Sequence, residues 1–161
     1  MRNVDFFLKI GTLLPGFKGY QEREGRRECD RQLRERIADK LSEIEIKVLA
    51  SIDNAELFEL KEIEKNHKKI NNIKDLIKYS PYGSSTFFSD SAIKESELEE
   101  IYQMDLDILH SVEKLESYIE TYNMYDLKIY IQKTEESINK RNQYLKERWY
   151  AKIDGNNRVS W

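Results

Sequence analysis

The sequence predicts an all-α protein, folded as an antiparallel four-helix bundle (up-down-up-down) with a short extra N-terminal helix. Three observations favour this fold class. Charged residues make up 35% of the 161 residues and hydrophobic residues 39%, a balance typical of long amphipathic helices. Only two prolines and six glycines interrupt the chain. Apolar residues recur every three or four positions over four long segments, which places them on one face of each helix.

The length suits one domain with a substantial core. We divide this single helical domain into a short helix and turn over residues 1–18, a four-helix body over 19–150 and a C-terminal tail over 151–161. The main alternative is a set of long coiled-coil hairpins that dimerises, because the same apolar seams would serve both arrangements.

The first segment predicts a short helix that ends before Pro15, since the residue before a proline avoids the α region. Its large apolar residues share one face: Phe6, Phe7, Ile10, Leu13, Leu14 and Phe17. We interpret it as a helix that closes one end of the bundle. The alternative is an interfacial membrane anchor, but the polar face rich in Lys and Arg that such anchors carry is missing. No stretch approaches the roughly 20 apolar residues of a membrane span.

The first body helix is predicted to begin near Tyr20, and its apolar seam is Leu33, Ile37, Leu41, Ile44 and Val48. Asp53 and Glu56 have the spacing of a capping box, which predicts a second helix over residues 54–79. The inward residues of this second helix are Leu60, Ile63, Ile70, Ile73 and Ile77.

Residues 79–91 predict a loop punctuated by Pro81 and Gly83, in which Phe87 and Phe88 plug the end of the bundle. Ser91 is expected to open the third helix. The seam of that helix is Ile101, Ile108, Val112, Leu115, Ile119 and Tyr122, with Asp105 as the one polar residue on the line. The fourth helix is predicted over residues 126–150, with Ile131, Ile138, Leu145 and Trp149 inward, and a Gly/Asn stop after it.

Eleven of the 18 residues from 19 to 36 are Arg, Glu or Asp. At about 100° per residue, the seam of the first body helix extends backward through Asp30, Arg26 and Arg23. The seam therefore changes from apolar to ionic. One interpretation is an internal ionic layer, in which these arginines bind carboxylates at the acidic start of the third helix (Glu95, Glu97, Glu99 and Glu100).

A second interpretation of the same stretch is a contact surface for a protein partner or a second copy of the chain. Its candidate residues are Phe17, Tyr20, Arg23, Arg26, Arg27, Arg31 and Arg34. A third is a phosphate or nucleic-acid site, which the interleaved acids disfavour because they repel a phosphate backbone. The net charge of −3 and the pI of about 5.6 also argue against nucleic acid as a partner.

Two pairs have the carboxylate-x-x-His spacing of di-iron bundles: Glu64 with His67, and Asp107 with His110. This spacing supports an alternative in which the chain binds metal. It fits poorly, because the pairs fall on neighbouring helices and at different heights. We take solvated or core-edge histidines as the simpler interpretation.

Nothing else in the sequence forms a catalytic motif. The single Cys29 cannot form an internal disulfide, so we expect a reducing compartment, the cytoplasm. We interpret Cys29 as a lone exposed thiol. We therefore expect a non-catalytic protein without a cofactor that acts through protein–protein contact. The alternatives are the metal-binding bundle and an accessory protein for nucleic acid or a membrane surface.

Overall fold

The computed structural model describes residues 7–8, 10–12, 14–79, 81, 84–89, 93–121 and 124–157, and the side chains within these ranges up to residue 148 except at 85, 89, 124 and 125. Over these residues the chain is helical and contains no strand. The elements in order are η1 (Arg23–Gly25), α2 (Arg26–Ala50), η2 (Ser51–Asn54), α3 (Leu60–Lys78), α4 (Ser84–Ser89), α5 (Glu95–Glu120) and α6 (Met124–Asn157). Among the helices described, none is both long and apolar enough to cross a membrane.

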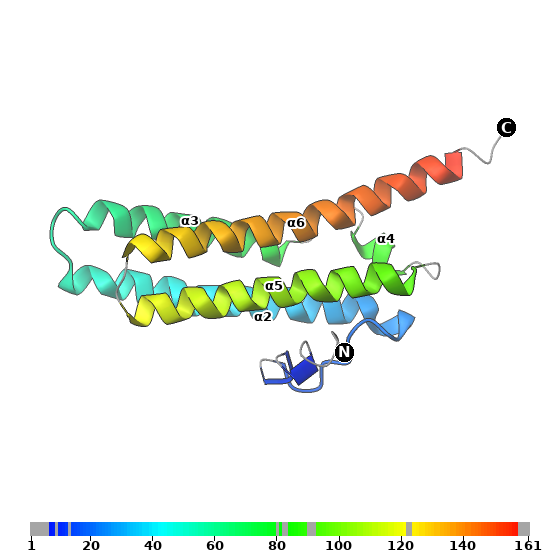
Figure 1. Ribbon diagram of the computed structural model, residues 1–161, viewed down its shortest axis with the longest axis horizontal. Helices are drawn as coiled ribbons and strands as arrows, with labels where there is room; N and C mark the ends of the chain where they lie inside the picture. Colours follow the sequence, from blue (N-terminus) through cyan, green and yellow to red (C-terminus); the bar gives the residue numbers. More distant parts are fainter. Residues whose placement is uncertain are drawn as a thin grey trace.

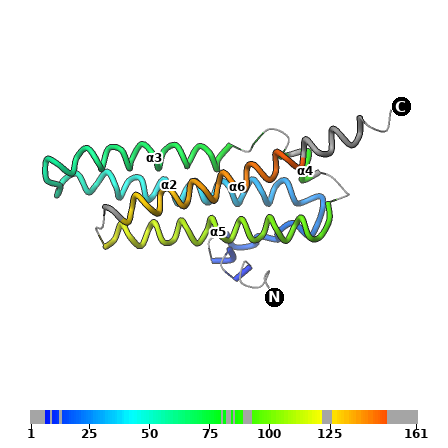
Figure 2. The backbone as a smooth tube through the Cα atoms, turned by 45° about the horizontal axis from the view of Figure 1, so that its top comes forward, coloured from blue at the N-terminus to red at the C-terminus, as the bar shows by residue number. Residues whose placement is uncertain are grey.

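The four long helices lie lengthwise beside one another (Figure 1). The sequence colours run in opposite directions along consecutive long helices. Helices α2 and α5 therefore begin at the end of the molecule toward which α3 and α6 run. Helix α2 packs on α3 and α5, and α6 packs on the same two helices from the other side. The short α4 contacts α2 and α6. The N-terminal segment lies alongside α5 in both views (Figure 2).

The predicted seams form the core. All five seam residues of α2 are at most 3% exposed, and Ile63, Ile70, Ile73 and Ile77 of α3 are at most 1% exposed. The α5 and α6 seams are buried at Ile101, Ile108, Val112, Leu115, Ile131, Ile138 and Leu145. Each fully buried Leu or Ile contributes about 1.5–3 kcal/mol, so these seams are the main source of stability. Phe87 and Phe88 are fully buried, as predicted, although α4 replaces the expected loop around them.

Three boundaries differ from the sequence prediction. Helix α2 begins at Arg26 rather than near Tyr20, because the short helix η1 comes before it. Helix α3 begins at Leu60 rather than near residue 54, because η2 ends α2 with a further turn. The capping box at Asp53 is wrong: the Glu59 side chain accepts the backbone N–H of Glu56 at 2.8 Å. Helix α6 continues past Gly155 to Asn157. A single glycine costs a helix only about 1 kcal/mol, which neighbouring residues can offset.

Some predicted roles cannot be compared with the structure. Those of Phe6, Leu13, Gly83, Ser91, Tyr122 and the Trp149 side chain lie outside the described residues. Helix α5 begins at Glu95, where the Glu97 side chain accepts the backbone N–H of Lys94 at 3.2 Å. A carboxylate in the first turn also interacts favourably with the helix dipole.

Candidate functional site

A buried ionic cluster lies where the polar start of α2 meets α5 and α6. At its centre is Arg141 of α6, which is fully buried. Its Nε donates to Asp105 Oδ1 at 2.5 Å, and its Nη2 donates to Asp30 Oδ1 at 2.6 Å. Nη2 also lies 3.3 Å from the hydroxyl oxygen of Tyr20. One guanidinium thus joins α2, α5, α6 and the turn before η1.

Tyr20 forms the second centre of the cluster. Its hydroxyl donates to Asp105 Oδ2 at 2.7 Å, and its backbone N–H donates to the Tyr102 hydroxyl oxygen at 2.5 Å. Its carbonyl accepts Arg26 Nε at 2.6 Å. Gly19, just before it, has φ +75°, and a Cβ there would lie 2.6 Å from the Tyr102 hydroxyl oxygen. Only glycine therefore lets the chain pass this point without displacing Tyr102.

The cluster also reaches the end of α3. Asp30 Oδ2 accepts Arg34 Nε at 2.9 Å, and Arg34 Nη1 donates to the Lys78 carbonyl at 2.5 Å. We call the set Tyr20, Asp30, Arg34, Asp105 and Arg141 the Arg141 cluster. It contacts all four long helices and contains two carboxylates and two guanidiniums.

Burial decides the protonation of the Arg141 cluster. Desolvation, followed by the charge of Asp105, raises the pKa of Tyr20 well above its ordinary value, so the hydroxyl keeps its proton and donates it. Desolvation acts to lower the pKa of Arg141, but Asp105 and Asp30 outweigh it and hold that pKa well above its ordinary value. Burial raises the pKa of Asp105, and Arg141 opposes that shift. The cluster is suited to holding helices together rather than to proton transfer.

The internal ionic layer predicted from residues 19–36 therefore exists, but its predicted partners are wrong. Its charged partners are Asp105, about one and a half turns beyond Glu100 on α5, and Arg141 on α6. Of those acids, Glu97 lies 3.7 Å from Arg148 at the partly exposed edge. The acids at the start of a helix are better placed for its first-turn N–H groups, as Glu97 shows.

The seven predicted contact residues divide by burial. Tyr20 is fully buried, and Arg26 and Arg34 are each 8% exposed, so assigning these three to a contact surface is wrong. They point into the cluster because they continue the seam side of α2. Phe17 is half-buried, whereas Arg23, Arg27 and Arg31 are exposed. Arg31 pairs with Glu28 at 2.5 Å and Glu35 at 2.6 Å on its own helix.

The four metal candidates do not come together. His67 Nε2 lies 2.9 Å from Glu45 Oε1 on α2, and Lys74 Nζ lies 2.9 Å from the other oxygen of that carboxylate. Glu64 and His110 are exposed, and Asp107 accepts an amide N–H of Gln103 at 3.0 Å. Among the described residues, no group of three or more His, Cys, Asp or Glu is placed to hold a metal ion. Cys29 is buried rather than exposed, and desolvation raises the pKa of its thiol.

Sequence reasoning missed Arg141, although the sequence carries a signal for it. Arg141 lies on the α6 seam between Ile138 and Leu145, as Asp105 lies on the α5 seam between Ile101 and Ile108. Opposite charges on the seams of two adjacent helices predict a buried ion pair, because either charge alone would be strongly unfavourable in the core.

Helix α2 turns into α3 at one end of the molecule (Figure 1), and five large apolar residues in and around this turn are exposed. We define the α2–α3 tip as Ile46, Leu49, Ile52, Leu57 and Phe58. Leu57 is 85% exposed and Phe58 is 78% exposed. This surface was not predicted, because Leu57 and Phe58 were placed inside the second helix.

Comparisons of the chain with protein-family models, with curated proteins and with solved structures found no match.

Proposed function

We propose that this chain is a non-catalytic cytoplasmic protein that acts by docking another protein at the α2–α3 tip, on an antiparallel, up-down-up-down four-helix bundle. The pairing of α2, α3, α6 and α5 around a shared core supports the bundle. The lone, buried Cys29 supports a reducing compartment.

One observation carries the proposal: five large apolar side chains between Ile46 and Phe58, at the α2–α3 turn, are exposed. The apolar seams of the helices bury their Ile and Leu residues almost completely. The exposure of apolar side chains at the tip is therefore not due to a poorly formed core. Contiguous exposed apolar patches are typical of contact sites, and aromatic side chains are enriched at the centres of interfaces. Phe58, flanked by Leu57, is the expected anchor.

Charge indicates what kind of partner the tip fits. Between Ile46 and Leu60 the chain carries three acids, Asp53, Glu56 and Glu59, and one cation, Lys47, which pairs with Glu116 of α5 at 3.2 Å. A second copy docked tip to tip would bring these acids together, and like charges across an interface are unfavourable. The tip therefore suits a different protein, one with an apolar groove rimmed by Lys or Arg.

The test compares the Leu57→Ser/Phe58→Ser double variant with Ile129→Ser, which alters a half-exposed apolar residue on α6 that is not one of the five tip residues. When the wild type and Ile129→Ser are used as bait in the native host, both should retain the same partner. The purified partner should bind the double variant at least tenfold more weakly, since anchor truncations cost about 2 kcal/mol or more.

Circular dichroism should show equal helicity for all three proteins, because the altered side chains are exposed. Binding to the wild type should weaken as salt is raised, as acidic and basic rims predict. Equal partner binding by the double variant and the wild type would refute the role of the tip. Concentration-dependent dimerisation through the tip would refute the choice of a different protein as partner.

A further inference from the structure

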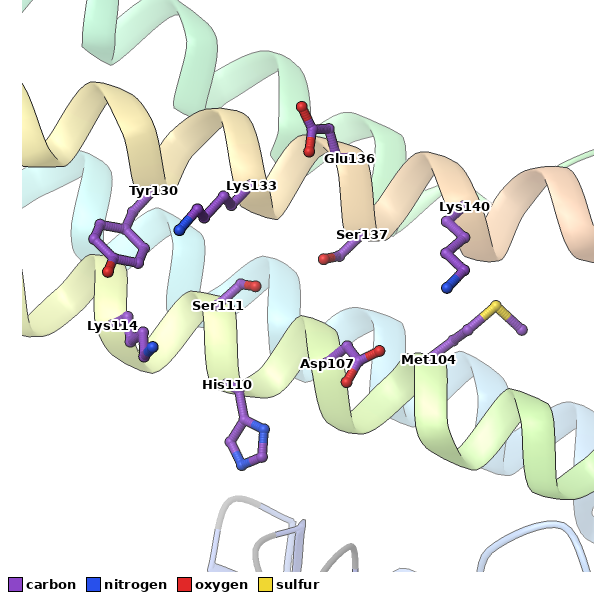
Figure 3. Close-up of a pocket in the computed structure, with 10 residues that line it drawn as sticks. All are labelled: Met104, Asp107, His110, Ser111, Lys114, Tyr130, Lys133, Glu136, Ser137 and Lys140. Atoms are coloured by element: carbon purple, nitrogen blue, oxygen red, sulfur yellow. The ribbon is translucent and has the colours of Figure 1, made fainter.

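A groove lined mostly by polar and charged residues lies between α5 and α6, with a volume of about 440 Å³ (Figure 3). This volume is within the range of small-molecule sites, about 300–1,000 Å³. Its polar lining comes from both helices. This lining includes Ser111, Lys114, Tyr130, Lys133, Ser137 and Lys140.

Two lysines, one from each helix, line the end of the groove at Tyr130. Lys114 Nζ of α5 lies 5.7 Å from the centre of the Tyr130 ring, and Lys133 Nζ of α6 lies 4.9 Å from it. Tyr118 stacks on Tyr130, with ring centres 4.4 Å apart. A hydrogen bond from Tyr118 lowers the pKa of Tyr130; the charges of the two lysines add to this shift, and burial and the charge of Asp126 oppose it.

These lysines have no carboxylate partner in the described part of the chain. Other lysines differ: Lys47 lies 3.2 Å from Glu116, and Lys74 lies 2.9 Å from Glu45. Like charges placed close together without a counter-ion repel one another. The groove is therefore a place where an anion would be stabilised.

The two acids of the groove are already engaged on their own helices. Asp107 accepts the Gln103 amide at 3.0 Å, and Glu136 accepts the Gln132 amide at 3.2 Å. Between the helices, Figure 3 shows the hydroxyl groups of Ser111 and Ser137. The groove thus offers hydrogen-bond donors beside the unpaired ammonium groups.

We propose that this groove binds a phosphoryl group, with Lys114 and Lys133 supplying the charge and Ser111 and Ser137 donating hydrogen bonds to its oxygens. Lysine binds phosphate as a point charge, and hydroxyls are ordinary phosphate donors. Lys140 lies farther along the groove and would contact the remainder of the ligand.

The surroundings restrict the ligand to a compact one. At the end away from Lys114 and Lys133, next to Asp107 and Lys140, the groove continues into a part of about 290 Å³ whose lining includes Glu100 and Glu147 (Figure 3). These acids would repel a long polyanion, so nucleic acid does not fit the site. A phosphomonoester fits, whether as a soluble metabolite or as a lipid headgroup.

The test is a titration of the ¹⁵N-labelled full chain with inorganic phosphate at pH 7.5, at constant ionic strength held with sodium chloride. Amides near Lys114, Lys133 and Ser137 should shift and saturate, with a Kd on the order of 1 mM, as befits a small anion. Lys114→Gln and Lys133→Gln should each weaken binding by about tenfold, the loss of one charge-assisted contact. Lys146→Gln removes an exposed charge from the same helix, outside the groove, and should leave Kd unchanged.

Two further arms separate the sources of the phosphoryl group. Glycerol 3-phosphate in solution represents a metabolite, and phosphatidylcholine vesicles containing phosphatidic acid represent a headgroup. Saturable binding in either arm, lost in Lys133→Gln, supports the site and names its source. Shifts that do not saturate, or that Lys146→Gln and Lys133→Gln reduce equally, would overturn it. The groove and the tip share no residue, so failure here leaves the docking proposal standing.

Discussion

Replacing Arg141 by Met tests the most specific feature of this fold. Met keeps much of the apolar volume but removes the charge that Asp105 and Asp30 share. Asp30 retains Arg34 at 2.9 Å, and Asp105 retains only the Tyr20 hydroxyl at 2.7 Å. Breaking a buried ion pair by removing one partner costs about 3–5 kcal/mol, because a charge is left buried without compensation. That loss is a large fraction of the roughly 5–15 kcal/mol by which domains are stable.

Urea unfolding followed by circular dichroism at 222 nm measures this loss. The midpoint should fall while the slope stays unchanged, which shows a change in stability rather than in the surface exposed. Arg148→Met is the matched control, seven residues on in α6, where the side chain is 43% exposed and lies 3.7 Å from Glu97. Such an exposed pair is worth about 0–1 kcal/mol. If Arg141→Met costs no more than Arg148→Met, the Arg141 cluster does not hold the helices together.

Three other outcomes follow from the same region. Arg141→Leu/Asp105→Leu should recover part of the stability lost in Arg141→Met, because the carboxylate left uncompensated is removed and Asp30 keeps Arg34, while the buried Tyr20 hydroxyl loses its acceptor; a double variant less stable than the single one would contradict this. Gly19→Ala should cost about 2–4 kcal/mol from left-handed backbone and overpacking, against about 1–2 kcal/mol for Gly16→Ala, which has φ +85° but open space; equal costs in urea would contradict it. Tyr20 keeps its proton in the fold but ionises when unfolded above its ordinary pKa of 10, so stability should fall as pH rises beyond 10. Tyrosinate absorbance at 295 nm should then show Tyr20 ionising only as helicity is lost, and full ionisation with intact helicity would contradict the burial.

The helical seams were predictable because burial repeats at the helical period. The helical period alone predicts that Ile37, Leu41 and Ile44 are buried, because the apolar face of an amphipathic helix must pack against some other element, whichever it is. Helix ends were less predictable. Whether Asp53 or Glu59 caps a backbone N–H depends on how η2 turns, and competing short-range contacts decide that within one or two kcal/mol.

The Arg141 cluster was predictable only in part, because pairing between helices depends on height. The change of the α2 seam from apolar to ionic is visible in Arg26 and Asp30. Choosing their partners requires knowing which turn of α5 and α6 lies opposite, and the sequence offers many acids and bases. The start of α5 has the most acids, which favours it as the predicted partner. The true partners, Asp105 and Arg141, are marked instead by their positions on the apolar seams of α5 and α6.

The cluster also explains how apolar seams of such regular spacing can specify one alignment. Ile131, Ile138 and Leu145 recur every seven residues, so sliding α6 by seven residues would seat apolar side chains in apolar holes again. Arg141 removes that ambiguity, because only one alignment places its guanidinium between Asp105 of α5 and Asp30 of α2. Any other alignment leaves charges in the core without partners, at a cost of several kcal/mol. A buried ionic layer of small net stability can therefore still select among packings that the apolar seams alone would leave nearly equal.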